Sequence, residues 1–299
     1  MSLIHTLISG KSITFKRMFI DLTKALITGV DGMLGSYVDF GIRTNRQTLD
    51  LSLGPSVVYK AVAYQPSVII HLAAQTNVDD SERNPESTFS TNSVGTYYLA
   101  LAARKLKVPM VYISTSGIFD GQKKEPYTED DEPNPQNIYS HSKYLGELAV
   151  RGLLNNYIIA RIGWLFGGGP DKDRKFVGTI LRQLEKPVIK VTEDQFGSPT
   201  YGKDVVKAIC SLLIGGKRGI FNVVNKGIAS RDALAKEIIT IAGSTTKVES
   251  VLLSSFSFAA TRIRNEGLTS ENVQLRPWQE ALREYYKSEW YPRLNPQNR

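Results

Sequence analysis

Short apolar runs, separated by longer amphipathic or turn-rich segments, form the main pattern of this chain. Runs of this length bounded by turn residues are typical of strands that are buried on both faces of a sheet. They predict strands at 24–28, 41–44, 67–71, 110–114, 157–161 and 219–224. The intervening segments predict a short helix after residue 29 and helices at 85–107, from 139 onward, 202–213, 231–241 and 277–286. This alternation predicts an α/β fold with a doubly wound parallel sheet and a smaller C-terminal lobe.

Composition and charge narrow the classes of partner. The 299 residues suffice for one large domain or two smaller ones. The formal net charge of +8 suits an anionic partner, but the chain has no dense Lys/Arg run and no nucleic-acid motif. A diphosphate-bearing small molecule explains the charge equally well, and we predict no nucleic-acid partner. No apolar window is long enough for a membrane span, so no membrane partner is predicted.

Cysteine and histidine usage bears on metal sites and location. The single cysteine, Cys210, excludes an internal disulfide and a multi-cysteine metal site. His5, His71 and His141 are too far apart in the sequence to form a histidine metal motif, so no metal site is predicted. A reducing, cytoplasmic location fits this composition best.

A glycine-rich turn follows the first predicted strand. Gly29, Gly32 and Gly35 form the pattern G-x-x-G-x-x-G, with Met33 and Leu34 between the last two glycines. The first glycine permits a tight turn, the second lets a pyrophosphate approach the backbone, and the third allows close helix packing. Free N–H groups and the positive end of the following helix dipole then hold the phosphate charge. In this context the turn predicts a dinucleotide-binding site.

The residues after the second predicted strand bear on which dinucleotide binds. Asn45 and Arg46, with Arg43 nearby, stand where a carboxylate often binds the adenosine ribose. Arginine at this place accommodates a 2′-phosphate, which favours NADP(H) over NAD(H). The alternative, that these are ordinary surface arginines, has about equal weight. Asp50 and Leu51 are expected near the adenine edge.

A second candidate site combines a Tyr/Lys pair with a hydroxyl at a strand end. Tyr139 and Lys143 stand four residues apart in a predicted helix, which places both side chains on one face. An ammonium beside a phenol lowers the pKa of the phenol, so the tyrosine can exchange a proton near neutral pH. Thr115 follows the strand 110–114, where a hydroxyl can hydrogen-bond a substrate carbonyl. Taken singly, these features also fit a solvated helix face and a turn hydroxyl.

Six segments of the chain occur in the order found in one protein family. They read GVDGMLG, HLAAQTNVD, YISTSGIFDG, PNPQNIYSHSKYLGE, RIGWLFG and DQFGSPT. In this order the chain resembles the dTDP-4-dehydrorhamnose reductases, which are extended short-chain dehydrogenases/reductases. The resemblance covers residues 25–202 and thins toward the C terminus, where ATRIRN is similar to a family element A-x-R-P-x-N. It implies a Rossmann fold, a reduced nicotinamide cofactor and hydride delivery to carbon 4 of a nucleotide-linked keto-sugar.

Carried over by position, the resemblance implies roles for individual residues. Thr115 is implied as the catalytic hydroxyl, Tyr139 as the proton donor, and Lys143 as its pKa-lowering partner and a ligand of the nicotinamide ribose. The residues expected to contact the cofactor are Gly29, Gly32, Met33, Leu34, Gly35, Asn45, Arg46, Asp50, Leu51, Leu72, Ala73, Ala74, Asn92, Tyr139 and Lys143. Those expected to contact the substrate are Thr76, Val78, Ser114, Ser116, Trp164 and Gln195. Trp164 also fits the alternative of an ordinary packing aromatic.

The chain departs from the family pattern at the substrate side. Ser116 and Gly117 replace the Asp and Tyr of the family element S-T-D-Y-V-F-D-G, and Ile162 and Gly163 replace the Thr and Ser of R-T-S-W. Losing a carboxylate and a ring should open the pocket and remove polar selection. We therefore expect a nucleotide-linked keto-sugar substrate, which need not be the rhamnose precursor.

Domain boundaries can be proposed from the same pattern. Residues 1–20 form an N-terminal extension, which is either a targeting peptide or, as we favour, residues before a conventional start at Met18. We assign 21–165 and 197–225 to an NAD(P)-binding Rossmann domain, and 166–196 and 226–299 to a substrate-binding lobe.

Two alternatives to a reductase stay open. A non-catalytic regulatory subunit of methionine adenosyltransferase is related to this family and keeps much of the fold with the Tyr/Lys motif. A nucleotide-sugar epimerase or dehydratase is the other alternative, although Ser116 in the usual Asp place argues against a dehydratase-like acid pair. A nucleotide-sugar is the expected ligand in either enzymatic case, and a homodimer is possible because some family members are magnesium-dependent dimers.

Overall fold

Six parallel strands form the central sheet of the computed structural model, which describes residues 20–294. The sheet has the order β10-β5-β4-β3-β1-β2. Its strands are β1 (Ala25–Thr28), β2 (Ile42–Thr44), β3 (Val68–His71), β4 (Met110–Thr115), β5 (Tyr157–Ile162) and β10 (Gly219–Asn222). Every residue of β1, β3 and β4 is buried, as apolar runs in a doubly covered sheet should be. The predicted doubly wound, Rossmann-type sheet is confirmed, whereas the predicted extension lies outside the described residues except for Ile20.

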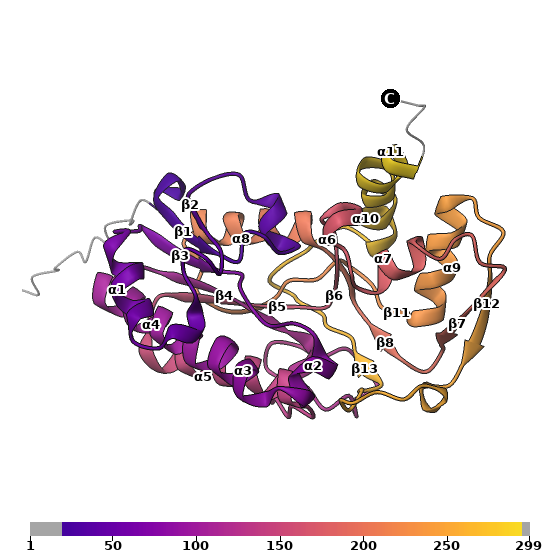
Figure 1. Ribbon diagram of the computed structural model, residues 1–299, viewed down its shortest axis with the longest axis horizontal. Helices are drawn as coiled ribbons and strands as arrows, with labels where there is room; N and C mark the ends of the chain where they lie inside the picture. The colour runs from indigo at the N-terminus through magenta and orange to yellow at the C-terminus, as the bar shows by residue number, and fades with distance from the viewer. Residues whose placement is uncertain (1–19, 295–299) are drawn as a thin grey trace, which may run out of the picture.

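Helices cover both faces of this sheet (Figure 1). One face packs against α8 (Gly202–Ile214), whose apolar side joins the core formed by alternate residues of the strands. The other face packs against three helices, which are α1 (Ser56–Ala63), α4 (Gly95–Leu106) and α5 (Ile138–Leu153). Burying both faces in this way leaves the carboxyl ends of the strands as the open edge of the sheet.

Two helical segments differ from the expectation. Helix α1 was not predicted, and the short helix expected after the glycine turn is a single 3-10 turn at Leu34–Tyr37. The predicted helix 85–107 is divided into α3 (Pro85–Phe89), a π-helical turn at Ser90–Val94 and α4. The π-turn carries one extra residue, and such insertions occur frequently at functional sites.

The C-terminal portion forms a second lobe with its own core, at the right of Figure 1. Its helices are α6 (Gly169–Lys172), α7 (Phe176–Leu181), α9 (Arg231–Ala242), α10 (Trp278–Tyr285) and α11 (Tyr291–Leu294). Its strands form the small sheets β11-β8-β13, β12-β7 and β6-β9. They are β6 (Trp164–Phe166), β7 (Val188–Thr192), β8 (Phe196–Gly197), β9 (Pro199–Tyr201), β11 (Ala229–Ser230), β12 (Lys247–Val251) and β13 (Asn265–Glu266).

The second core also takes side chains from the sequence assigned to the first domain. Trp164 and Tyr201 pack with Leu234, Trp278 and Tyr285. Because the second core includes residues assigned to the first domain, the packing does not separate the two units at the predicted boundaries, which stay a prediction. The remaining elements are short: α2 (Val78–Arg83), 3-10 turns at Leu22–Lys24, Leu51–Leu53, Ser116–Ile118 and Leu253–Ser255, and a π-turn at Tyr286–Trp290.

The strand order positions a crevice at the open edge of the sheet. The chain winds from β1 to β2 on one side, and from β3 to β4 and β5 on the other, so the winding direction reverses between β1 and β3. Ligands bind in doubly wound folds at such a switch point. Gly29 follows β1 with φ +74°, and a Cβ on it would lie 2.6 Å from the backbone of Ala73, which follows β3. Only glycine allows the two loops to approach this closely.

A buried ion pair fixes helix α5 to the sheet. Glu147 of α5 accepts hydrogen bonds from Arg161 of β5 at 3.1 Å and 2.9 Å, in the bidentate geometry that carboxylate and guanidinium favour. Relative exposure is 0% for Glu147 and 1% for Arg161. The guanidinium also donates to the carbonyl of Glu129 at 3.2 Å and lies over the ring of Phe119. The pair therefore fixes the rotation of α5 about its own axis.

Breaking this pair should destabilise the fold. We expect Glu147→Gln to lower the free energy of unfolding by about 3–5 kcal/mol, because it leaves the Arg161 guanidinium buried without a counter-charge. The exposed Glu280→Gln is the matched control and should change stability by less than about 0.5 kcal/mol. Urea denaturation measures both, and equal unfolding midpoints for the two variants would contradict the prediction. The double variant Glu147→Leu, Arg161→Met should recover most of the stability, since it removes both charges together.

Candidate active site

A single cavity of about 1530 Å³ lies along the carboxyl ends of the strands and extends into the second lobe. It brings together most of the residues that the sequence singled out. Those lining it are Gly29, Gly32, Met33, Leu34, Asn45, Arg46, Asp50, Leu51, Leu72, Ala73, Ala74, Thr76, Val78, Ser114, Thr115, Tyr139, Lys143, Trp164 and Gln195. Gly35, Asn92 and Ser116 do not line it.

The glycine turn forms one end of the cavity. Gly29 and Gly32 line it, whereas Gly35 faces the turn itself, where a Cβ would lie 2.4 Å from the backbone of Val30. The third glycine therefore serves close packing, and its expected contact with the cofactor stays a prediction. Because only one 3-10 turn follows, few peptide dipoles are aligned there, and a helix dipole would contribute less to a phosphate site at this turn than we expected.

The loop after β2 forms the edge of the cavity where an adenosine ribose is expected. Asn45 donates a hydrogen bond to the carboxylate of Asp31 at 2.9 Å. Arg46 pairs with Asp50 at 3.5 Å, but its side chain is 84% exposed, so this surface pair restrains the guanidinium only weakly. Arg43 is exposed on β2 and does not line the cavity. Of the two arginines, Arg46 is therefore the one placed to reach a bound phosphate.

Asn92 lies behind the cavity, in the π-turn before α4. Its carboxamide accepts a hydrogen bond from the Gln75 N–H at 2.8 Å and donates to the Gln75 carbonyl and the Ser142 hydroxyl, both at 3.0 Å. Ser142 in turn donates to the carbonyl of Tyr139 at 2.7 Å. The polar atoms of the Asn92 side chain are all used within the protein. Asn92 thereby ties the loop after β3 to helix α5, and its expected contact with the cofactor stays a prediction.

Helix α5 carries Tyr139 and Lys143 on the face that meets the cavity. It begins after Asn137, whose side chain caps it by accepting a hydrogen bond from the Ser140 N–H at 2.9 Å. Across from it, Thr115 ends β4, and its hydroxyl accepts a hydrogen bond from the Gly117 N–H at 3.1 Å. Thr115, Tyr139 and Lys143 all line the same cavity.

Burial controls the protonation of this group. It raises the pKa of Tyr139 to about 12, against a smaller opposing effect from a hydrogen bond with Thr115. Burial lowers the pKa of Lys143 to about 7, although Glu147 one turn further along α5 opposes that shift. The Lys143 ammonium lies 4.1 Å from the ring centre of Tyr112. Burial thus keeps the phenol protonated at neutral pH, and the Tyr139 pKa is raised where we expected it to be lowered.

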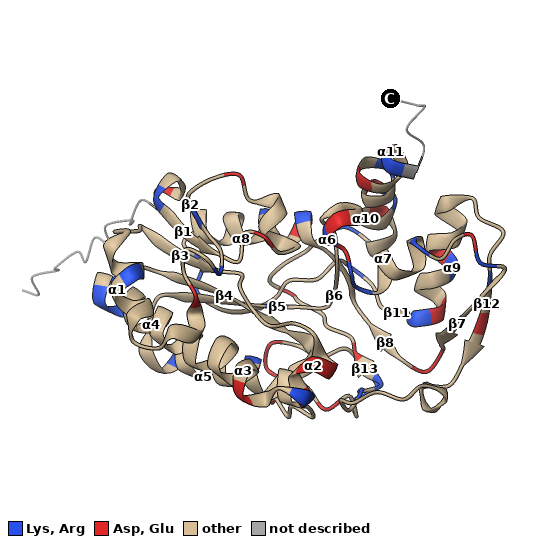
Figure 2. Cartoon of the chain, in the orientation of Figure 1, with Lys and Arg blue, Asp and Glu red and all other residues tan. Residues whose placement is uncertain are grey.

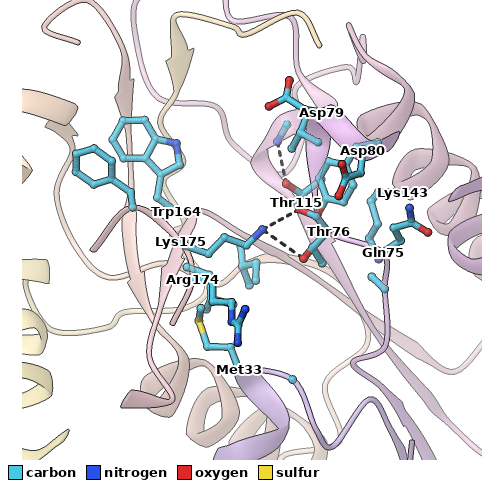
Figure 3. Close-up of a pocket in the computed structure, with 18 of the residues that line it drawn as sticks. Met33, Gln75, Thr76, Asp79, Asp80, Thr115, Lys143, Trp164, Arg174 and Lys175 are labelled. Atoms are coloured by element: carbon cyan, nitrogen blue, oxygen red, sulfur yellow. Dashed lines mark hydrogen bonds between the residues drawn. The ribbon is translucent and has the colours of Figure 1, made fainter. Parts of the chain in front are cut away.

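Basic and aromatic side chains from the second lobe line the other end of the cavity. The Arg231 guanidinium stacks on Trp164 at 3.5 Å and lies 4.6 Å from the ring centre of Phe176. Lys175 reaches across to the other lobe and donates to the carbonyl of Thr76 at 2.7 Å (Figure 3). Trp164 both lines the cavity and belongs to the second core. A role in substrate contact and a role in packing are therefore compatible for this residue.

Sequence reasoning missed this basic, aromatic end. The residues missed are Arg174, Lys175, Phe176, Arg231, Phe256, Phe258, Arg262 and Glu266. Residues 174–176 lie between two of the matched segments, and the other missed residues lie beyond the well-matched stretch. The segment ATRIRN, which contains Arg262, and the positive net charge were the available signals. Elsewhere, basic residues are spread over both lobes and interspersed with acidic ones (Figure 2).

Three buried polar atoms at the cavity have no hydrogen-bond partner among the described residues. They are the hydroxyls of Ser114 and Ser140 and the indole N–H of Trp164. Leaving such groups unpaired is unfavourable, and a polar ligand in the cavity would satisfy them. Together with the tight glycine turn, these atoms fit a polar dinucleotide and a polar substrate.

Neither a metal centre nor a membrane span is found in residues 20–294. No three His, Cys, Asp or Glu side chains of that range gather closely enough to hold a metal ion. In the same range, every helix is too short or too polar to cross a bilayer.

Known proteins match this chain over most of its length. Residues 23–290 match the family described as RmlD substrate binding domain. The spore coat polysaccharide biosynthesis protein SpsK of Bacillus subtilis is 32% identical over 278 residues, covering 88% of this chain and 97% of that protein. The dTDP-4-dehydrorhamnose reductase of Mycobacterium tuberculosis is 31% identical over 280 residues, covering 87% and 91%.

A solved structure extends the match to three dimensions. The dTDP-4-dehydrorhamnose reductase of Bacillus anthracis, in complex with NADP, superposes with a TM-score of 0.83 at 32% identity and covers 88% of this chain and 98% of its own. Sequence, fold and family match therefore agree, and the chain belongs to the RmlD substrate binding domain family, the family of the dTDP-4-dehydrorhamnose reductases.

Proposed function

We propose that this chain reduces the 4-keto group of a nucleotide-linked 6-deoxy sugar with NAD(P)H. It is an NAD(P)-dependent oxidoreductase acting on a sugar carbonyl. Similar proteins carry such names, among them the dTDP-4-keto-6-deoxy-D-glucose reductase of Streptomyces niveus, 32% identical over 229 residues. The observation that carries the proposal is one cavity in which Thr115, Tyr139 and Lys143 lie between a glycine turn and a basic, aromatic end.

The proposed reaction needs one hydride and one proton. The reduced nicotinamide supplies the hydride to carbon 4. Thr115 and Tyr139 hydrogen-bond the carbonyl oxygen and orient it, and Tyr139 donates its proton as that oxygen gains negative charge. A pKa of about 12 keeps Tyr139 in the protonated form that this step requires. The Lys143 ammonium then stabilises the phenolate left on Tyr139, since opposite charges nearby favour ionisation.

The two ends of the cavity are proposed to bind different nucleotides, the cofactor at one end and the sugar nucleotide at the other. The glycine turn and Arg46 are proposed to hold the cofactor, and Arg46 favours the 2′-phosphate of NADP(H). Arg174, Arg231 and Arg262 are proposed to neutralise the diphosphate of the sugar nucleotide, because guanidinium groups bind phosphate oxygens in a bidentate manner. The aromatic side chains beside them offer flat surfaces for the base and the sugar.

Replacing the proton donor tests the reaction. We expect Tyr139→Phe to lower kcat for NADPH oxidation by about 10²–10⁴-fold with a nucleotide-linked 4-keto-6-deoxy sugar, because only the phenolic proton is removed. Tyr144→Phe, on the same helix but outside the cavity, is the control and should retain activity. The decrease in NADPH absorbance over time, followed with a panel of such sugars, measures the activity of both variants. NADPH binding without turnover on the entire panel would favour a regulatory, NADP-binding role instead.

Replacing Arg46 tests the cofactor preference. Arg46→Ala should raise KM for NADPH by about tenfold and leave KM for NADH nearly unchanged, because it removes a charged partner of the 2′-phosphate alone. Arg43→Ala, which alters an exposed arginine outside the cavity, should change neither value. Steady-state kinetics with the two cofactors decide the matter, and parallel changes in both KM values would reject the assignment.

The buried Lys143 makes a prediction about stability and pH for the cofactor-free protein. Its pKa falls from an ordinary 10.5 to about 7 on folding. Between these values the unfolded chain binds a proton that the folded chain lacks, so the Lys143 contribution to stability rises with pH. We expect the wild type to gain stability relative to Lys143→Met between pH about 7.5 and about 9. Urea denaturation across this range measures the difference, and a constant difference would contradict the prediction.

A further inference from the structure

The carboxylate of Glu266, on β13, lines the cavity, whereas the family carries its carboxylate at the position of Ser116, after β4. The family has an Asp where this chain has Ser116, and we expected polar selection at the sugar to be lost. Instead, Glu266 of β13 lines the cavity, and its Oε2 accepts a hydrogen bond from the Ser116 hydroxyl at 3.1 Å. Ser116 itself is buried and does not line the cavity. The serine therefore orients a carboxylate that comes from the second lobe.

The backbone around Glu266 is held on both sides. Strand β13 pairs with β8 at Glu266 and Gly197. Asn265 donates to the carbonyl of Lys123 at 2.7 Å, and Gly267 accepts a hydrogen bond from the Tyr127 N–H at 2.7 Å. A carboxylate on such a fixed backbone is preorganised for recognition, since little motion is lost when it binds.

Glu266 lies beside the reacting end of the cavity, because its hydrogen-bond partner Ser116 directly follows Thr115 in the chain. The negative charge of Glu266 helps to raise the pKa of Tyr139. It also raises the pKa of Arg231, against the lowering that burial causes. One carboxylate oxygen is engaged by Ser116. Its Oε1 accepts no hydrogen bond within residues 20–294, so one acceptor remains for a donor inside the cavity.

We infer that Glu266 accepts a hydrogen bond from the hydroxyl on carbon 3 of the sugar, and that the enzyme requires this hydroxyl to be free. The inference rests on the proposed function. In a 4-keto-6-deoxy hexose, carbon 4 is flanked by carbon 3, which bears a hydroxyl, and carbon 5, which bears none. With the carbonyl oxygen on Tyr139, the hydroxyl on carbon 3 is the donor next to the reacting carbon that a carboxylate in this part of the cavity could accept from. Glu266 is thus a specificity-determining residue, and Ser116 is its positioning residue.

Binding measurements test this inference independently of turnover. The probes are dTDP-linked 6-deoxy hexoses with and without the 3-hydroxyl, titrated calorimetrically into the protein saturated with NADP⁺. We expect wild type to bind the hydroxyl-bearing sugar about 10- to 100-fold more tightly, as for a hydrogen bond to a charged group. Glu266→Ala should reduce that preference to about threefold or less, with the affinity for NADP⁺ unchanged as evidence of an intact fold.

A conservative variant at the same position provides the matched rescue. Glu266→Gln keeps an acceptor oxygen on β13 and should retain more of the preference for the hydroxyl than Glu266→Ala does. Equal affinities of wild type for the two sugars, or an unchanged preference in Glu266→Ala, would overturn the inference while leaving the reductase proposal intact. A clear preference for the hydroxyl-bearing sugar without turnover would reject the reductase proposal and support the role of Glu266 in recognising the hydroxyl. No binding of either sugar beside bound NADP⁺ would overturn both.

Discussion

The buried carboxylate of Glu147 is the constraint on which the candidate site depends. It has two positive neighbours, the Arg161 guanidinium on β5 and the Lys143 ammonium one turn away on α5. The ion pair with Arg161 sets how α5 lies on the sheet, and α5 in turn presents Tyr139 and Lys143 to the cavity. The same carboxylate favours the charged form of Lys143 against the effect of burial. One side chain thus links the mechanical support of the helix to the protonation of the site that the helix carries.

The chemistry divides between the two lobes. The Rossmann sheet supplies the glycine turn and the hydroxyl of Thr115, whose positions follow from the strand order. The second lobe supplies the basic and aromatic end and the carboxylate of Glu266. In the proposed reaction, proton transfer would use residues of the first lobe, whereas recognition of the sugar nucleotide would use mainly residues of the second lobe. Substrate preference can change in such an arrangement without disturbing the reacting group.

Local patterns made part of this structure predictable. The buried strands, the glycine turn and the spacing of Tyr139 and Lys143 are properties of short segments, and the sequence carries them directly. Helix α1 was missed because its sequence, SVVYKAVA, is rich in β-branched residues, and tertiary packing of Val57 and Ala61 outweighs that preference. Glu266 could not be found because its partner Ser116 is 150 residues away. The pKa of Tyr139 was misjudged for a related reason, since burial is decided by the whole fold.

The π-turn at Ser90–Val94 has a consequence for how this helix can change in evolution. The turn inserts one residue between α3 and α4, and Asn92 occupies it with every polar atom of its side chain engaged. Deleting any residue of the segment would restore regular helical winding and rotate one half of the helix by about 100° against the other. Either the Asn92 links to Gln75 and Ser142 or the packing of α4 on the sheet would then be lost. The structure should therefore tolerate a change of length in this segment less well than a substitution of one of its exposed side chains.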